Sequence, residues 1–194
     1  MAVTALAVFT IWALVGFGLR AWIQLRSTGD TGFRVGGVTG AQRAVAALLA
    51  VGLLCCAAGP VAALAGLGGL DHPALAFPGM VVAVCGIAAT LAAQLSMGPS
   101  WRVGVDPGER THLVTDGPFA HVRNPIYTAM LATLAGLAAM TPNLPSLVGL
   151  ALVLLAIEVQ VRAVEEPHLR RIHGVAYTAY AARTGRFLPA VGRG

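Results

Sequence analysis

The sequence contains little charge and no lysine. Only 11% of its 194 residues are charged, whereas a soluble domain carries about a quarter. Hydrophobic residues make up 57% of the chain, and the mean hydropathy is +0.76. These values exclude an ordinary soluble domain and indicate an integral membrane protein with one structural domain.

The basic residues are all arginine, and they do not form the kind of patch that binds nucleic acid. The formal net charge is +5. The arginines stand between apolar stretches and form no run with interleaved aromatic residues, so we expect no nucleic-acid partner. Their positions suit contact with anionic headgroups, which makes membrane lipids the expected surroundings.

Cysteine is scarce as well. Cys55, Cys56 and Cys85 fall inside apolar stretches, and neither a CxxC motif nor a His/Cys cluster occurs. Adjacent cysteines on a helix point in different directions, so we predict neither a disulfide nor a metal site. The three residues are expected to pack as small apolar side chains within a helical bundle.

The first apolar stretch lacks the basic region that precedes a secretory signal. Residues 1–23 are almost entirely apolar, and the first charge, Arg20, stands near their far end. The stretch is also too long for a signal peptide. We therefore expect it to be a retained first membrane span.

Five apolar segments predict an all-α integral membrane bundle of about five transmembrane helices. Residues 141–145 join the last two segments and are rich in helix breakers, which predicts a tight hairpin of antiparallel neighbours. Residues 1–97 then hold three helices, and residues 98–194 hold a loop, the hairpin 125–164 and a tail, 165–194. The segments run approximately over Ala2–Ile23, Ala44–Leu70, Pro73–Met97, Ile126–Met140 and Ser146–Val164.

The arginines predict the orientation of this bundle. Most of them lie in segments 24–43, 98–125 and 165–194, whereas the loops around Asp71-His72 and at 141–145 contain none. By the positive-inside rule, the N-terminus is expected outside and the C-terminus in the cytoplasm. The expected location is an inner or plasma membrane of bacterial type.

The tail carries a helical pattern that is not a membrane span. Leu169, Ile172, Ala176 and Tyr180 recur at steps of three and four residues, with charged residues between them. This pattern predicts an amphipathic helix over Glu165–Arg183, on the membrane surface or capping the bundle.

The unusual polar residues gather in two of the arginine-rich segments, 98–127 and 158–186. Their order and spacing resemble the isoprenylcysteine carboxyl methyltransferase and phospholipid methyltransferase superfamily of membrane enzymes, over roughly residues 94–189. The pieces that carry the resemblance are Leu113-Val114-Thr115-Asp116-Gly117-Pro118-Phe119, Arg123-Asn124-Pro125-Ile126-Tyr127, and Glu165-Glu166 with Tyr177 and Tyr180 after it.

The resemblance implies methyl transfer from S-adenosyl-L-methionine, bound in a cytoplasmic pocket, to a lipophilic small molecule that enters from the bilayer. Carboxylates can accept hydrogen bonds from the cofactor's ribose or ammonium group, and the turn 112–117 can supply main-chain groups, since glycine permits close approach. Leu113 and Val114 can wall the adenine. The cofactor-binding candidates are His112, Leu113, Val114, Gly117, Asn124, Tyr127, Glu165 and Glu166.

Arg123 and Arg183 are the predicted catalytic residues. A guanidinium can hold a carboxylate or phosphate through two hydrogen bonds and so align the nucleophile. In the family, the arginine after the paired tyrosines of the tail is associated with catalysis, and Arg183 occupies the matching position.

Asn124 stands where the family has a histidine, and it cannot titrate. This favours an acceptor that is already ionised, such as a carboxylate of the isoprenylcysteine type. An amine or phenol acceptor would have to give its proton to His112 or Glu165.

Two other functions stay open from the sequence. Membrane lipid reductases with similar tails bind a nicotinamide cofactor, but they usually need more chain and more basic contacts. A non-enzymatic bundle is the other alternative, although no inverted repeat supports transport. A membrane methyltransferase is the favoured interpretation.

Overall fold

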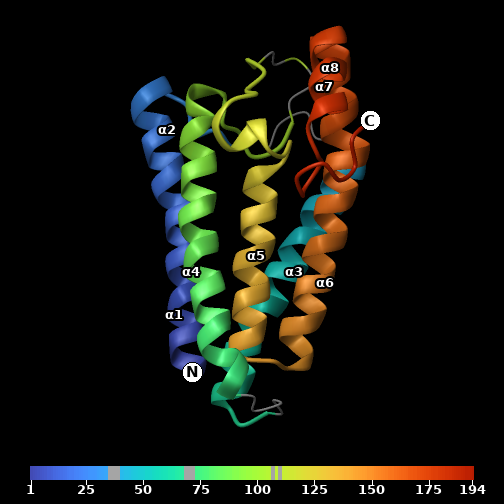
Figure 1. Cartoon of the computed structure of the whole chain (residues 1–194). Coiled ribbons are helices and arrows are strands. Elements are labelled where there is room, and N and C mark those ends of the chain that lie inside the picture. The colour runs from blue at the N-terminus through green and yellow to red at the C-terminus, as the bar shows by residue number, and fades with distance from the viewer. Residues whose placement is uncertain (35–39, 68–72, 106–107, 109–110) are drawn as a thin grey trace.

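The computed structural model describes residues 1–34, 40–67, 73–105, 108 and 111–194. These residues form a bundle of helices (Figure 1), and they contain two isolated β-bridges but no sheet. The all-α prediction is therefore confirmed. The loop at Asp71-His72 and Arg110, both used to predict the orientation, lie outside the described residues.

Four of the described helices are long and apolar enough to cross a membrane: Ala2–Thr28, Gln42–Leu64, Ala74–Ser96 and Leu144–His173. The first consists of α1 (Ala2–Ala13), a π-helical turn η1 (Leu14–Leu19) and α2 (Arg20–Thr28). The second and third belong to α3 (Gly40–Leu64) and α4 (Pro73–Ser96). The fourth joins α6 (Leu144–Val159), a second π-helical turn η4 (Gln160–Glu165) and α7 (Glu166–His173).

The remaining predicted span, α5 (Pro125–Met140), is shorter. Its 16 residues rise about 24 Å, less than the roughly 30 Å of a bilayer's hydrocarbon core. Pro125 occupies the first helical turn, where a missing N–H costs nothing. In Figure 1 the helix stands among α3, α4 and α6, and more than half of its residues are buried.

Several predicted helix boundaries are wrong. The second helix ends at Leu64 and not near Leu70, and the first continues beyond Ile23 to Thr28, where Gly29 adopts the left-handed conformation. The tail is not one amphipathic helix, because Gly174 (φ 52°, ψ −121°) separates α7 from α8 (Val175–Arg183). Glu165 and Glu166 do not begin a new helix, as predicted, but lie inside the continuous 30-residue helix Leu144–His173.

The predicted hairpin is present, but its arms pack mainly against other helices. Helix α5 packs chiefly against α4, and α6 against α3. Glycines permit the close approach of α4 and α5, since a Cβ on Gly136 would lie 2.5 Å from the carbonyl oxygen of Gly79. At the turn, the Asn143 side chain accepts a hydrogen bond from the Ser146 amide and donates one to the carbonyl of Gly59 on α3.

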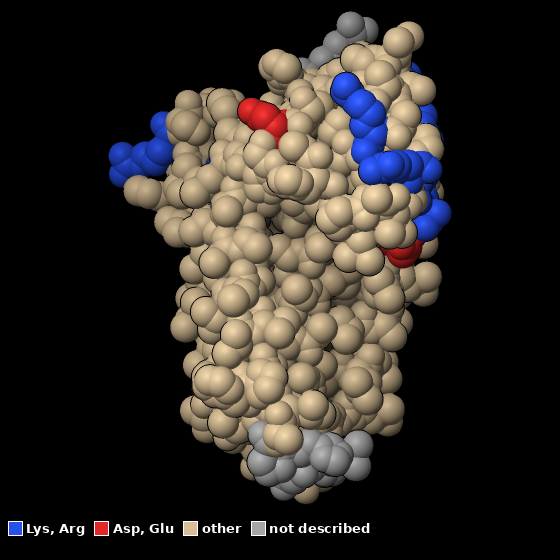
Figure 2. Space-filling view, viewed as in Figure 1, with Lys and Arg blue, Asp and Glu red and all other residues tan. Residues whose placement is uncertain are grey.

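The described arginines all belong to segments at the end of the bundle opposite the N-terminus (Figure 1). On the face seen in Figure 2, the basic surface gathers at this end, and the rest of the face is almost free of charge. We call it the arginine-rich end. The loop after α4, the start of α5 and the tail all meet there.

Replacing Gly136 by valine should destabilise the bundle, because the added side chain would collide with the backbone of α4. Overpacking of this kind costs about 1–3 kcal/mol, which thermal unfolding of the purified protein in detergent can measure. Gly18→Ala is the control, since no atom lies within 4 Å of a Cβ at Gly18. Equal melting temperatures for both variants would contradict the close contact of α4 and α5.

Candidate active site

A cavity of about 250 Å³ opens at the arginine-rich end. Its walls come from α1, α3, α4, α5, α7 and α8, from the π-helical turns η1 and η4, and from residues of the loops at 97–105 and 111–124. Leucine, valine and aromatic side chains supply much of the surface. Segments far apart in the sequence therefore meet around one apolar space that carries a few polar groups.

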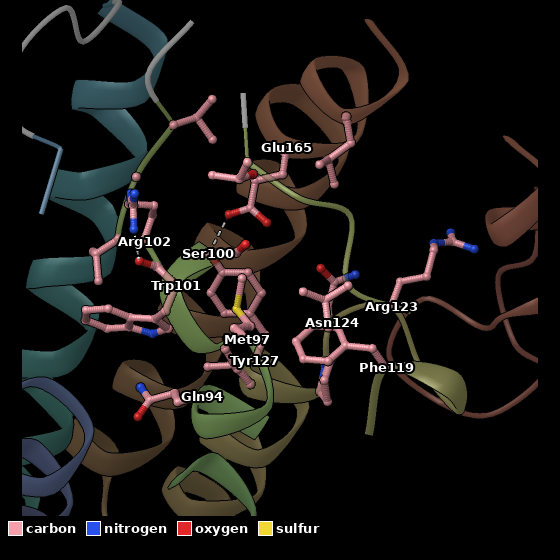
Figure 3. A pocket seen from close by; sticks show the side chains of 18 of the residues that line it. Gln94, Met97, Ser100, Trp101, Arg102, Phe119, Arg123, Asn124, Tyr127 and Glu165 are labelled. Carbon is pink, nitrogen blue, oxygen red and sulfur yellow. Dashed lines mark hydrogen bonds between the residues drawn. The ribbon is translucent and has the colours of Figure 1, made fainter. Parts of the chain in front are cut away.

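Glu165 is an acidic residue of the cavity wall with polar side chains around it. Its Oε1 accepts hydrogen bonds from the Tyr127 hydroxyl at 2.6 Å and from Gln160 Nε2 at 3.1 Å. Both donors are uncharged, and none of the ion pairs found among the described residues includes Glu165. Figure 3 shows Glu165 and Tyr127 meeting at the centre of the cavity. The cavity wall thus presents a carboxyl group whose hydrogen-bond donors, among the described residues, are uncharged.

Glu166, the next residue, faces a different environment. It is 3% exposed. Arg186 donates to both of its oxygens, at 2.6 and 3.1 Å, and Arg123 donates to Oε1 at 3.1 Å. Arg170 adds a longer contact of 3.5 Å. The hydrogen bond to Glu166 raises the pKa of the Arg186 guanidinium. We call Arg123, Glu166 and Arg186 the carboxylate clamp.

Arg123 also binds the tail of the chain. Its Nη atoms donate to the carbonyl oxygens of Ala181, Thr184 and Gly192 at 2.6–2.9 Å. The guanidinium is buried, and Figure 3 shows its side chain extending away from the cluster around Glu165. These contacts engage both Nη atoms and fasten residues 184–194 to the start of α5.

The two tyrosines of α8 close another side of the cavity. Tyr177 and Tyr180 are buried and line the cavity, and the Tyr180 hydroxyl donates to the Phe119 carbonyl at 2.6 Å. Burial raises the pKa of both phenols to about 12, so both stay protonated at neutral pH. The hydrogen bond ties α8 to the turn that precedes α5.

The loop after α4 is held by α2. Arg20 donates to the Gly98 carbonyl at 2.6 Å and its guanidinium lies 4.7 Å from the centre of the Trp101 ring. Gln24 donates to the Pro99 carbonyl at 3.0 Å. These contacts fix the loop that brings Trp101 and Arg102 to the cavity wall.

The inner end of the cavity, away from the arginine-rich end, lies beside the π-helical turn η1. Gln94 of α4 donates through Nε2 to the Gly16 carbonyl of this turn at 2.8 Å. Trp12, one turn before Gly16, lines the same end. A π-helical turn disturbs the regular backbone ladder, and such turns frequently occur at functional sites.

The structure brings most of the predicted site residues together, but not all of them. Gly117 does not line the described cavity; it adopts a positive φ of 55° in the turn before α5. Arg183 is exposed and likewise absent from the described wall, so the geometry gives no support to its predicted catalytic role. The predicted residues that line the cavity are His112, Leu113, Val114, Arg123, Asn124, Tyr127, Glu165 and Glu166.

Sequence reasoning missed several residues of the site. Arg186 belongs to the carboxylate clamp, three positions after the predicted Arg183. Gln94 is a polar residue in an otherwise apolar helix, and this is a sequence signal that marks an interior-facing position. Trp12 gave no signal, because one tryptophan in an apolar helix is common in membrane proteins.

Glu166→Gln should loosen the tail, because it removes the buried charge that faces Arg123 and Arg186. Breaking a buried pair costs about 3–5 kcal/mol, so we expect a lower melting temperature and faster hydrogen exchange in residues 184–194. Glu158→Gln is the matched control, because the Glu158–Arg162 pair is much more exposed and is worth at most about 1 kcal/mol. Unchanged exchange in the tail of Glu166→Gln would contradict the clamp.

Comparison with known families gives one match. A sequence model of the phospholipid methyltransferase family matches residues 75–176, which include most of α4, all of α5 and α6, and both glutamates, and which end one residue before Tyr177. No curated protein matches the chain. The matched residues make up more than half of the chain and contain most of the cavity wall. The chain therefore belongs to the phospholipid methyltransferase family, membrane enzymes that transfer a methyl group from S-adenosylmethionine.

Proposed function

We propose that this lipid methyltransferase binds S-adenosylmethionine beside Glu165 and transfers the methyl group to an amine of a membrane lipid. The observation that carries the proposal is the carboxylate of Glu165, which meets only neutral donors in the cavity wall. A negative charge in an apolar cavity favours a cationic ligand. The cofactor carries an ammonium and a sulfonium group, and a lipid amine is cationic when protonated.

The residues of the outer cavity fit the cofactor. Leu113 and Val114 offer an apolar wall for the adenine, and Glu165 can accept from the ribose hydroxyls or the ammonium group. Arg102 lines the same cavity and can pair with the carboxylate of the cofactor. When bound, S-adenosylmethionine supplies a methyl group whose bond to sulfur breaks as the acceptor bonds to the carbon, and the electron pair stays on sulfur.

The chain's own part in this reaction is alignment and the exclusion of water. Displacement at a methyl group needs little covalent help, so most of the rate comes from holding the reacting atoms in line. Tyr127, Tyr177 and Tyr180 pack around the cavity and restrict water. A protonated amine must also lose a proton before its lone pair can react, and Glu165 is the carboxylate that can accept it.

A second cavity can hold the acyl chains of the lipid. This cavity, of about 630 Å³, lies between α3 and α6 and is walled by apolar residues such as Val45, Ala46 and Ile157. It shares Leu49 and Tyr127 with the first cavity. We propose that acyl chains lie in this second cavity while the headgroup reaches past Leu49 and Tyr127.

A carboxylate acceptor, as in isoprenylcysteine methylation, is the second candidate. It needs a guanidinium at the reacting end, and Arg123 already binds Glu166 and three carbonyl groups of the tail. Arg102 is the observation in its favour, since this arginine lines the cavity. The engagement of Arg123 leads us to favour the amine.

The orientation is also a proposal. The gathering of the described arginines at one end of the bundle supports a cytoplasmic site and C-terminus, with the N-terminus on the opposite side of an inner or plasma membrane of bacterial type.

Glu165→Gln should weaken cofactor binding, since the charge that faces the cationic ligand is lost. The wild-type protein should melt at a higher temperature with S-adenosylhomocysteine present, because a ligand that binds the folded state stabilises it. We expect most of this shift to vanish in Glu165→Gln and to persist in the control Glu158→Gln. A full shift in Glu165→Gln would contradict the assignment of Glu165, and no shift in the wild type would contradict the cofactor cavity.

Labelled methyl transfer to a panel of lipids should identify the acceptor. We expect label in a primary-amine phospholipid and none in a fatty acid or a prenylated carboxylic acid, with the product identified by mass. Label in the acids alone would overturn the amine and favour the second candidate. Wild-type protein without S-adenosylmethionine gives the background.

A further inference from the structure

The inner end of the cavity contains two buried polar atoms without a hydrogen-bond partner among the described residues. They are Oε1 of Gln94 and Nε1 of Trp12. Both residues line the cavity, and they are 4% and 2% exposed. A buried polar atom left unpaired destabilises the folded protein, so such atoms in a cavity wall call for an explanation.

The backbone of η1 determines which atom of Gln94 stays unpaired. The Gly16 carbonyl of this turn accepts a hydrogen bond from Nε2 at 2.8 Å. This bond holds the side-chain amide of Gln94 with its nitrogen toward the Gly16 carbonyl, so Oε1 is left to accept a hydrogen bond from another group. Trp12 contributes the complementary group, because an indole nitrogen can only donate.

The surroundings of this pair are apolar. Leu49 and Met130 line the same inner end, and Thr90 donates its hydroxyl proton to the Gly86 carbonyl of its own helix at 2.8 Å. Thus, in the described wall, the inner end offers one fixed acceptor and one fixed donor within an apolar surface. Leu49 also lines the second cavity, so the proposed place of the acyl chains lies next to the first cavity.

We propose that Gln94 and Trp12 form the subsite for the reacting end of the acceptor lipid and select a nitrogen that carries an N–H. This inference rests on the proposed function. One N–H donates to Gln94 Oε1, and an oxygen of the same headgroup accepts from Trp12 Nε1. A primary or secondary amine that donates to Gln94 keeps its lone pair free, turned away from the amide.

The pair also determines which lipids are rejected. A carboxylate has acceptors but no donor, so it would leave Gln94 Oε1 unpaired and face a carbonyl dipole of the wrong sign. A quaternary ammonium has no N–H, and neither has a tertiary amine whose lone pair is free, so both lose the same hydrogen bond. The subsite therefore favours primary and secondary amines over tertiary amines and over nitrogen that is fully methylated.

The test compares Trp12→Phe and Gln94→Met with two control variants in the full-length protein. Asn143 is also a buried residue whose side-chain amide nitrogen donates to a backbone carbonyl, but it does not line the described cavity. Asn143→Leu therefore reproduces the loss of a buried amide that occurs in Gln94→Met. Trp22→Phe, at an exposed tryptophan of α2, is the control for Trp12→Phe.

The two measurements are the melting shift with S-adenosylhomocysteine and the KM for a primary-amine phospholipid in mixed micelles. Trp12→Phe and Gln94→Met should keep the shift and raise KM by about tenfold, the equivalent of one lost hydrogen bond. Both controls should keep the wild-type KM. Trp12→Phe removes no hydrogen bond found among the described residues, so it carries the test if Gln94→Met does not fold.

The outcomes separate the two proposals. An unchanged KM in Trp12→Phe and in folded Gln94→Met, with normal wild-type transfer to the amine, would overturn the subsite and leave the proposed function standing. An equal rise in the controls would also overturn it, because the loss would then be structural. Wild-type protein that shows no shift, or that methylates carboxylic acids alone, would overturn the proposed function and the subsite with it.

Discussion

A buried carboxylate is stable only while the cations around it stay in place, and the arginine-rich end of this protein is built around one such group. Glu166 of α7 binds Arg123, at the start of α5, and Arg186, in the tail. Arg123 binds three carbonyl groups of the tail in addition. Removing any member would leave charge buried without compensation. The clamp therefore joins three separate parts of the chain into one unit.

The clamp also explains how adjacent glutamates can have different roles. Consecutive residues on a helix point about 100° apart, so the contacts that hold Glu166 toward the tail leave Glu165 facing the cavity with Tyr127 and Gln160. One carboxylate binds guanidinium groups, and the other accepts hydrogen bonds from uncharged side chains of the cavity. The placement of Glu165 thus depends on contacts that Glu165 does not make.

Much of this arrangement could be predicted from the sequence, for identifiable reasons. The lengths of the apolar segments predicted the helices, because the hydrophobic pattern is nearly uninterrupted. The hairpin between Arg123 and Glu166 predicted that these residues are neighbours, and the structure confirms it with a contact of 3.1 Å. The family pattern predicted the cavity wall, since it names residues that the fold brings together.

The remaining features depend on backbone geometry that leaves no periodic signal. The tail folds back after Thr184, which brings Arg186 to Glu166 and leaves Arg183 exposed. The two π-helical turns could not be predicted either, because they have no composition that distinguishes them from the helices around them. Gln94 and Trp12 are far apart in the sequence, and both line the cavity because α4 packs beside η1, where the Gly16 carbonyl accepts from Gln94.

The π-helical turn η4, over Gln160–Glu165, comes immediately before Glu166. A π-helical turn accommodates one more residue than the same stretch of α-helix. Deleting a single residue from 161–164 would therefore let the helix return to regular α geometry without turning α7. The same deletion within the regular helix α6 would turn everything after it by about 100°, and neither carboxylate would then face its present partners. In this helix the number of residues carries information that the residue types alone do not, and an alignment that ignores a one-residue gap here would pair the wrong acids.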